Sequence, residues 1–404
     1  MQPRPTAVFA DSKRHYPLLD ALRGVAALVV VVFHLFEAFN GGNHLVQIIN
    51  HGYLAVDFFF LLSGFVIGYA YDDRWGSLTL GSFFKRRLIR LHPMIVMGMI
   101  VGAVCYYFSA SPVLFPRIAD TPLWQMLLVM LVGFTLVPLP VSMDIRGWTE
   151  MHPLNGLAWS LFFEYIANLL YALLLRRLPN AALALLVALA GAALLHLGLT
   201  SPYGDVIGGW SLDPVQLRVG FTWLLYPFLA GLLLARTVRP GRIRHAFWWS
   251  DLLLVAVLAM LRIGGSEQLW LNGFYDALVI LLVFPLIVYI GASGSTEGSS
   301  SAAQWLGDIS YPLYITHYPL IYIYTAWVVD HQLSIPEAVP AALLTFAAAV
   351  ALAHLLLKLY DEPAPLAHPA VDGALVVGQF RVVRQLTPAR SAPLRRRTAP
   401  PAER

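Results

Sequence analysis

Long apolar stretches recur along most of this 404-residue sequence, and they constrain its fold more than any other feature. A helix needs about 20 mostly apolar residues to cross a bilayer. Only 12% of the residues are charged and the mean hydropathy is +0.66, whereas a soluble domain has about 25% charged residues. The alternating pattern of a membrane β-barrel is absent, so the sequence predicts an all-α integral membrane protein. The eleven apolar stretches lie at 18–39, 52–71, 88–108, 123–140, 155–175, 180–198, 215–235, 248–262, 271–291, 310–329 and 337–360.

The basic residues predict how the chain is threaded through the membrane, because cytoplasmic loops collect Lys and Arg. Basic clusters lie at 13–14, 85–90, 176–177 and 236–244, and again in the C-terminal tail. All of them fall on the cytoplasmic side only if the fourth apolar stretch does not span, and that stretch contains a glycine and two prolines. We therefore expect a bundle of about ten transmembrane helices plus one re-entrant or peripheral hydrophobic segment, with both termini cytoplasmic.

Three parts of the chain follow from this pattern. Residues 1–17 are expected to be a cytoplasmic N-terminal segment, residues 18–362 the transmembrane domain, and residues 363–404 a basic, disordered cytoplasmic tail. A single cysteine, Cys105, excludes a disulfide framework within the chain and a cysteine-cluster metal site. We expect no metal site.

The first apolar stretch carries two costly polar residues, Arg23 and His34, eleven positions apart. At about 100° per residue they share one helix face and lie about 16 Å apart along the axis. Glu37 follows one turn later on nearly the same face. Taken alone, Arg23 fits a side chain that snorkels to the headgroups as well as one that faces a functional path, and a single intramembrane histidine is often a packing residue.

Two of the carboxylates inside later apolar stretches are candidates for the site. Asp57 lies at the same expected depth as His34 on the next helix, so we expect it to orient that histidine as a general base. A purely structural cap or pair is the alternative for Asp57. Ser160, Glu164 and Asn168 follow one another at i+4 steps and form a polar stripe, in which a carboxylate is costly unless it is paired.

Two further patterns point to a lined cavity with a cationic mouth. Ser310, His317 and Tyr324 recur at i+7 intervals, which favours a polar face over an aromatic belt alone. The cluster at 85–90 places three arginines on one face at the start of an apolar helix, and arginine forks suit phosphates. From charge count alone, an ordinary topology signal is the better explanation of this cluster, and only the placement of the arginines inside an apolar helix favours an anion site. The arginines of the cluster are Arg86, Arg87 and Arg90.

Taken together, these stretches resemble acyltransferase family three, a family of integral membrane proteins. The resemblance rests on five pieces in the family's order: LDALRGVAALVVVVFH, VDFFFLLSGFVIG, RRLIRLHP, WSLFFE and ISYPLYITH. It implies a bundle of about ten helices in a bacterial inner membrane. It also implies the transfer of an acyl group, most often acetyl, from cytoplasmic acyl-CoA to a hydroxyl of an extracytoplasmic carbohydrate, a lipid-linked glycan or a secreted metabolite.

The resemblance also implies roles for individual residues. His34 matches the family's catalytic histidine and Arg23 its partner, while Arg87 and Arg90, with Arg86 beside them, match a basic motif linked to the donor. We expect acyl-CoA as a co-substrate, no permanently bound cofactor, contact with membrane lipids and no nucleic-acid partner. Two more positions, Glu164 and Tyr311, match other motifs of the family.

These expectations amount to one arrangement, in which a dry channel leads from a cationic vestibule at the inner surface to the imidazole of His34 near the outer leaflet. The main alternative is a proton-coupled secondary transporter that uses Asp57, His34, Glu164 and His317 as a relay. Transporters of that kind often carry internal repeats, and none is visible in this sequence. A non-catalytic membrane interaction protein is a third possibility.

Overall fold

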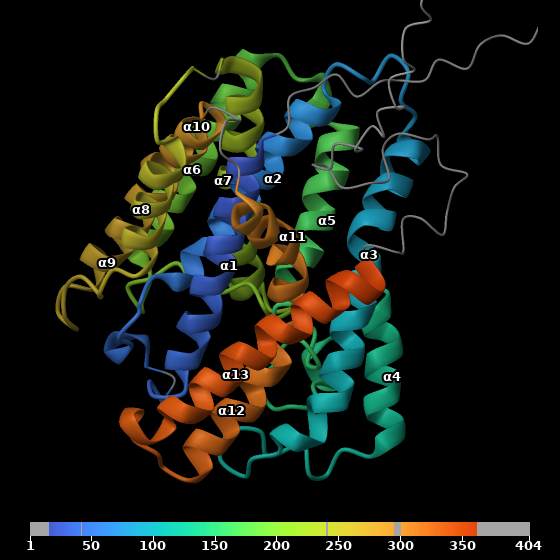
Figure 1. The fold of residues 1–404 in the computed structure, drawn as a ribbon, viewed down its shortest axis with the longest axis vertical. Coiled ribbons are helices and arrows are strands. Elements are labelled where there is room, and N and C mark those ends of the chain that lie inside the picture. The colour runs from blue at the N-terminus through green and yellow to red at the C-terminus, as the bar shows by residue number, and fades with distance from the viewer. Residues whose placement is uncertain (1–15, 42, 240, 295–299, 362–404) are drawn as a thin grey trace, which may run out of the picture.

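The computed structural model describes residues 16–41, 43–239, 241–294 and 300–361. Within these ranges the chain is helical and forms no named strand, which confirms the predicted all-α membrane fold (Figure 1). The first fifteen residues and the tail at 363–404 lie outside the described residues, so the predictions for these two segments stay predictions. The helices are α1 (Pro17–Glu37), α2 (Ala55–Tyr71), α3 (Leu80–Tyr106), α4 (Leu123–Phe134), α5 (Ala158–Leu173), α6 (Asn180–Thr200), α7 (Pro214–Thr237), α8 (Ala246–Leu258), α9 (Leu269–Leu278), α10 (Phe284–Ala292), α11 (Ser301–Thr316), α12 (Tyr318–Asp330) and α13 (Ile335–Leu356).

Eight helical stretches among the described residues are long and apolar enough to cross a membrane. The predicted count of about ten spans stays a prediction, because α8 has only 13 residues and the tenth apolar stretch is divided between α11 and α12. The eight stretches are Pro17–Glu37, Gly52–Tyr71, Leu80–Ser109, Ala158–Arg177, Asn180–Thr200, Pro214–Thr237, Leu269–Ala292 and Ile335–Tyr360.

The fourth apolar stretch forms the short helix α4, which lies against α3 at the edge of the bundle (Figure 1). Its 12 residues span about 18 Å, well short of a bilayer core. Only Met126, Val129 and Gly133 are buried, and they form the stripe that faces the bundle. The peripheral placement predicted from the basic loops therefore agrees with the structure.

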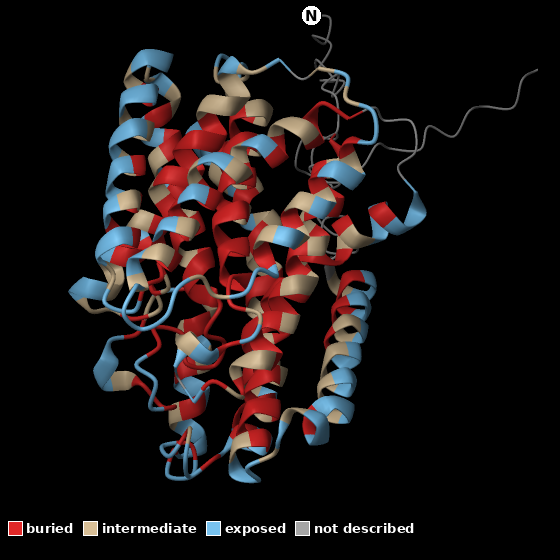
Figure 2. Cartoon of the chain, turned by 90° about the vertical axis from the view of Figure 1, so that its left-hand side faces the viewer, coloured by how far each residue is buried: buried red, intermediate tan, exposed pale blue. Residues whose placement is uncertain are grey.

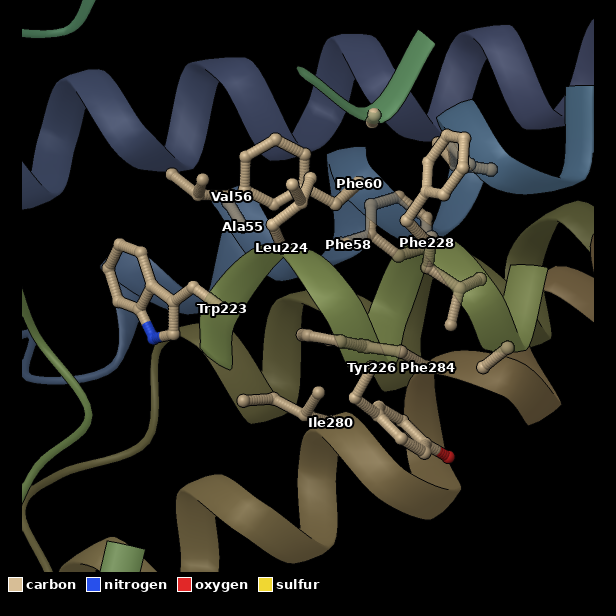
Figure 3. Close-up of a cluster of buried hydrophobic side chains, with 14 of the residues drawn as sticks. Ala55, Val56, Phe58, Phe60, Trp223, Leu224, Tyr226, Phe228, Ile280 and Phe284 are labelled. Carbon is tan, nitrogen blue, oxygen red and sulfur yellow. The ribbon is translucent and has the colours of Figure 1, made fainter. Parts of the chain in front are cut away.

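Small residues hold α2 and α7 in the closest helix pair of the bundle. A Cβ on Gly64 would collide with the carbonyl of Phe228, and a Cβ on Gly231 would collide with the carbonyl of Leu61. Such close approach is how membrane helices associate, since lipid gives no hydrophobic driving force between them. Around this contact, aromatic and branched side chains of α2, α7 and the α9–α10 segment interlock (Figure 3), while exposed residues cover the outer faces (Figure 2).

Helix α1 runs through the bundle and packs most closely on α11. Gly24 faces the carbonyl of Leu306, and on the other side of the contact Gly307 faces Asp20. Neither position has room for a Cβ without a shift of the helices. This contact brings the N-terminal half of α1, with Arg23, against the polar face of α11.

The chain breaks between α11 and α12 at His317, in the middle of the tenth apolar stretch. Pro319 has no N–H, so the carbonyl of Ile315 cannot receive its usual helical bond. The side-chain amide of Asn155 donates to that carbonyl instead, at 2.7 Å. A residue in the loop before α5 therefore fixes the position of the break.

The loops between α2 and α3, between α5 and α6, and after α7 meet at one end of the bundle. Arg236 forms an ion pair with Asp72 at 2.6 Å and donates to the carbonyls of Leu175 and Leu178. Arg176 lies over the ring of Trp75 at 4.0 Å. These basic loops therefore share one side, as the charge pattern requires.

Candidate active site

A cavity opens between α1, α2, α3, α5 and α11. Its volume is about 130 Å³, roughly ten times what one water molecule needs, so it is a site rather than a packing defect. Three guanidinium groups face it, from Arg23, Arg87 and Arg90, with Glu164 as the carboxylate among its lining residues. The rest of the wall is mostly apolar and includes Phe59, Phe60, Leu62, Val66, Ile67, Leu91, Leu161, Tyr311 and Tyr314.

Arg23 reaches the cavity from the N-terminal half of α1. Its Nε donates to the hydroxyl of Ser310 at 2.7 Å, and one Nη donates to the carbonyl of Gly307 at 3.2 Å. Asp20 lies 3.4 Å from the same guanidinium. The predicted partner of His34 is therefore held beside the donor arginines at the other end of α1, and it does not contact that histidine.

Glu164 links the polar stripe of α5 to the basic motif of α3. It forms an ion pair with Arg87 at 2.8 Å and accepts a hydrogen bond from Ser63 at 2.6 Å. The structure thus pairs the costly carboxylate, as expected. Ser63 on α2 is therefore a second polar partner of this carboxylate.

The three arginines of the basic motif differ in their placement. Arg87 is buried and Arg90 half-buried, and both line the cavity. Arg86 is not among the lining residues, so its predicted contact with the donor has no support from this cavity. Arg90 has no carboxylate within ion-pair distance among the described residues, which leaves its charge available to an anion.

At the opposite end of α1, His34 is oriented by its own helix. Its Nδ1 lies 2.5 Å from a carboxylate oxygen of Glu37. A carboxylate accepts the hydrogen bond, so Nδ1 carries the proton and Nε2 presents a lone pair. The prediction that Asp57 orients His34 is wrong, because both carboxylate oxygens of Asp57 are buried without a hydrogen-bond partner among the described residues. The i,i+3 spacing of His34 and Glu37 was the signal for the true partner.

His317 lies beside His34, with ring centroids 5.6 Å apart. Its Nδ1 is 2.8 Å from the carbonyl of Leu313, and the residue is fully buried. The ring of Tyr318 makes a T-shaped contact with that of His34, with ring centroids 4.7 Å apart. His317, which the sequence analysis placed on a lined cavity, therefore lies beside His34 and not on the wall of the arginine cavity. Tyr311 does line that cavity and donates to the carbonyl of Leu91 at 2.6 Å.

A partition separates the arginine cavity from the two histidines. Tyr314 lines the cavity, and its hydroxyl lies 2.8 Å from that of Ser160. Phe59 packs against Tyr314 edge to face at 5.3 Å, and the ring of His317 lies 6.3 Å beyond Tyr314. Neither His34 nor His317 lines the cavity, so the cavity does not extend to the histidines as the predicted channel would.

The loop between α4 and α5 packs against α12 near the histidines. Glu150 accepts hydrogen bonds from the hydroxyl of Tyr322 at 2.6 and 2.7 Å, and Arg146 lies over the Tyr322 ring at 3.7 Å. Burial raises the pKa of Glu150 to about 7, against the opposing effects of Arg146 and Tyr322. Tyr322 in turn contacts Tyr318, the neighbour of His34. Sequence reasoning missed this cluster, because only the fold brings 150 and 322 together.

Metal binding has no geometric support here, since no group of three or more His, Cys, Asp or Glu side chains in the described ranges could hold an ion.

Comparison with known proteins relates this geometry to a family. The model of the family Acyl_transf_3, described as an acyltransferase domain, matches residues 16–354. The chain is 36% identical to "Protein 2 in picA locus" of Rhizobium radiobacter over 163 residues, which cover 38% of the chain and 80% of that protein. It is 26% identical to "Acyltransferase MdmB" of Streptomyces mycarofaciens over 330 residues, 76% of the chain and 79% of that protein.

The third relative is a "Putative O-acetyltransferase" of Staphylococcus aureus strain COL, with 25% identity over 346 residues and 80% of the chain. The chain spans only 53% of that relative's length. No solved structure matches. Since the family model covers well over half of the sequence, the chain belongs to the membrane acyltransferase family that the five motifs indicated.

Proposed function

We propose that this chain is a bacterial inner-membrane O-acyltransferase that moves an acyl group, acetyl in the first place, from cytoplasmic acyl-CoA to a hydroxyl of an extracytoplasmic carbohydrate, lipid-linked glycan or secreted metabolite. One observation carries the proposal: a single helix, α1, places Arg23 in a cavity with two further arginines and places His34, paired with Glu37, at its other end. Family membership supports acyl transfer, and the proposal adds the donor, the acceptor and the base.

The cavity supplies what a polyanionic donor needs. Guanidinium forks bind phosphate oxygens bidentately, and three of them face one small space with a single lining carboxylate. Glu164 already holds one of them, so Arg87 is pre-oriented by its 2.8 Å ion pair before a ligand arrives. The apolar remainder of the wall suits the thioester arm and a short acyl group.

His34 supplies what the acceptor needs. A hydroxyl is a poor nucleophile until a base removes its proton, and a positioned base contributes typically 10²–10⁴-fold in rate. With Nδ1–H held by Glu37, the lone pair of Nε2 takes the hydroxyl proton as oxygen attacks the thioester carbon. The C–S bond then breaks and sulfur leaves with the electron pair.

Radiolabelled acetyl-CoA given to inside-out membrane vesicles tests the proposal. Vesicles with the wild-type chain are expected to retain label on a lumenal acceptor, and His34→Ala is expected to abolish this at equal protein level. Arg87→Ala is expected to raise the acetyl-CoA concentration needed for half-maximal transfer. A wild-type chain that moves a solute without transferring label would instead support the proton-coupled transporter.

A further inference from the structure

The lone pair on Nε2 of His317 is unexplained by the roles assigned so far. A carbonyl cannot donate, so the 2.8 Å contact with Leu313 shows that Nδ1 of His317 carries the proton. Nε2 is then an acceptor, and it is buried without a hydrogen-bond partner among the described residues. Leaving a buried acceptor unpaired is unfavourable, and such groups call for an explanation.

The ring is also held in place. His317 stands at the break between α11 and α12. Pro319 and the hydrogen bond from Asn155 to the carbonyl of Ile315 fix the position of this break. Its own bond to Leu313 fixes the orientation of the imidazole. A free Nε2 on a ring held from both sides is the arrangement expected of a group that receives a proton.

The neighbours of the His317 ring show which groups it lies beside. The ring centroid of His34 lies 5.6 Å from that of His317. The ring centroid of Tyr314, which lines the arginine cavity, lies 6.3 Å from that of His317. His317 is therefore a neighbour both of the proposed base and of a residue in the wall of the arginine cavity.

Resting on the proposed function, we propose that His317 is a further catalytic residue that delivers the proton taken up by His34 to the sulfur of the departing coenzyme A. The acceptor O–H bond breaks and its proton goes to Nε2 of His34. The new C–O bond forms, the C–S bond breaks, and sulfur takes the electron pair. The proton passes to Nε2 of His317 and from there to sulfur, so both imidazoles end neutral and the products are ester and thiol.

The partition constrains how this step occurs. Tyr314 donates its hydroxyl proton to Ser160, because the Ser160 hydroxyl already donates to the carbonyl of Leu157 at 2.9 Å. This bond holds the Tyr314 ring in the cavity wall, with its centroid 6.3 Å from that of His317. On this proposal, sulfur comes within reach of Nε2 of His317 only after the Tyr314 ring has turned aside. No proton is therefore delivered until a donor occupies the cavity.

The test removes Nε2 and keeps the local bond. In His317→Asn the side-chain amide takes the place of Nδ1 and can still donate to Leu313. Two donors are compared in vesicles. One is acetyl-CoA, whose alkyl thiolate is basic enough for protonation to assist its departure. The other is S-(4-nitrophenyl) thioacetate, whose weakly basic aryl thiolate leaves without such assistance. We expect His317→Asn to lose about 10²–10⁴-fold with acetyl-CoA and less than about threefold with the aryl thioester.

Two comparisons make the result specific. His34→Ala is expected to lose transfer from both donors, because it removes the base. His331→Asn is the matched control: His331 makes the same Nδ1 bond to a carbonyl one turn back, at 2.9 Å, but is exposed, and its loss is expected to change neither rate. Equal losses of His317→Asn with both donors, or no loss with acetyl-CoA, would overturn the relay.

A second measurement covers a variant that does not fold. In the wild-type chain, protonation of sulfur during departure predicts that the rate depends only weakly on the acidity of the thiol across a series of thioacetates. A steep dependence would overturn the relay. A wild-type chain that transfers no acetyl from any donor would overturn the proposed function itself, which is a different result.

Discussion

The carboxylate of Glu37 determines which nitrogen of His34 is available. The neutral imidazole of histidine has two tautomers, and only one leaves Nε2 free to accept a proton. The 2.5 Å contact selects that tautomer and fixes the ring against rotation. At this scale the structure corrects the sequence-based expectation, since the partner lies one turn away on the same helix and Asp57 has no part in the pair.

Replacing Glu37 tests the importance of this orientation. Glu37→Gln keeps a hydrogen-bonding side chain but removes the charge, and its amide can donate as well as accept, so both tautomers become populated. We expect the maximal rate of acetyl transfer to fall about 10²-fold, with little change in the acetyl-CoA concentration for half-maximal rate. Asp57→Asn is the comparison, and an equal loss in both variants would contradict a specific role for Glu37.

Glu150 predicts a pH dependence of stability that belongs to a single side chain. Its pKa is raised from 4.5 to about 7 by burial, so the folded state favours the protonated form. Stability from this group is complete below about pH 4.5 and is lost as the pH rises through 7, by about 3 kcal/mol in all. His152 acts oppositely, because burial lowers its pKa to about 4 and stability falls as the pH drops below 6.5.

Comparing variants isolates the Glu150 effect, since His152 is common to both proteins. Glu150→Gln retains the contact with Tyr322 without an ionisable group. The melting temperature of Glu150→Gln in detergent, minus that of the wild type, is expected to increase steadily between pH 5 and pH 8. The exposed Glu267→Gln change is expected to show no such trend. A difference between Glu150→Gln and wild type that stays constant with pH would show that Glu150 titrates normally.

At the scale of elements, the contact between α1 and α11 aligns the two ends of the site. Gly24 lets the helices approach until Arg23 reaches the hydroxyl of Ser310 on α11. The same helix α11 carries Tyr314 and ends before His317. A shift of α11 relative to α1 would therefore move the donor cavity and the histidine pair together.

A methyl group at Gly24 tests this alignment. The Cβ of Gly24→Ala would collide with the carbonyl of Leu306, which cannot move without its helix. Overpacking of this kind costs about 1–3 kcal/mol, so we expect a lower melting temperature and weaker donor binding. Gly81→Ala on α3 is the control, because a Cβ there meets nothing within 4 Å and a helical alanine is intrinsically favoured. Equal melting temperatures for the two variants would argue against a close α1–α11 contact.

The sequence predicts well those features that depend on residue spacing within one helix. It predicts poorly those that depend on contacts between helices. The apolar stretches, the peripheral fourth stretch and the shared face of Ser160 and Glu164 follow from helical spacing alone. The pairing of Glu164 with Arg87, the Tyr314 partition and the Glu150–Tyr322 contact depend on how distant segments pack. The break at His317 depends on Pro319, but its position is fixed by Asn155 from another part of the chain.

At the scale of the whole molecule, the two ends of the bundle carry different chemistry. Arg236 and Arg176 tie the basic loops together at the end where α1 begins, and the cavity arginines lie toward that end. At the other end, the loop after α1 contacts the loop after α6 through His44 and Asp205, at 3.2 Å. The donor and acceptor are thus expected to enter from opposite faces of the membrane.

Cysteine labelling tests this two-sided arrangement directly. Helix α6 has 21 residues and is long enough to cross once, so the exposed positions 177 and 203 on either side of it are expected to face opposite compartments. A membrane-impermeant maleimide added to spheroplasts should label Tyr203→Cys at once and Arg177→Cys only after lysis. The wild-type chain is the control, because its Cys105 is buried and should remain unlabelled in both conditions. Labelling of Arg177→Cys from outside would place the arginine cavity away from cytoplasmic acyl-CoA, and the direction of transfer proposed for this enzyme would have to be reversed.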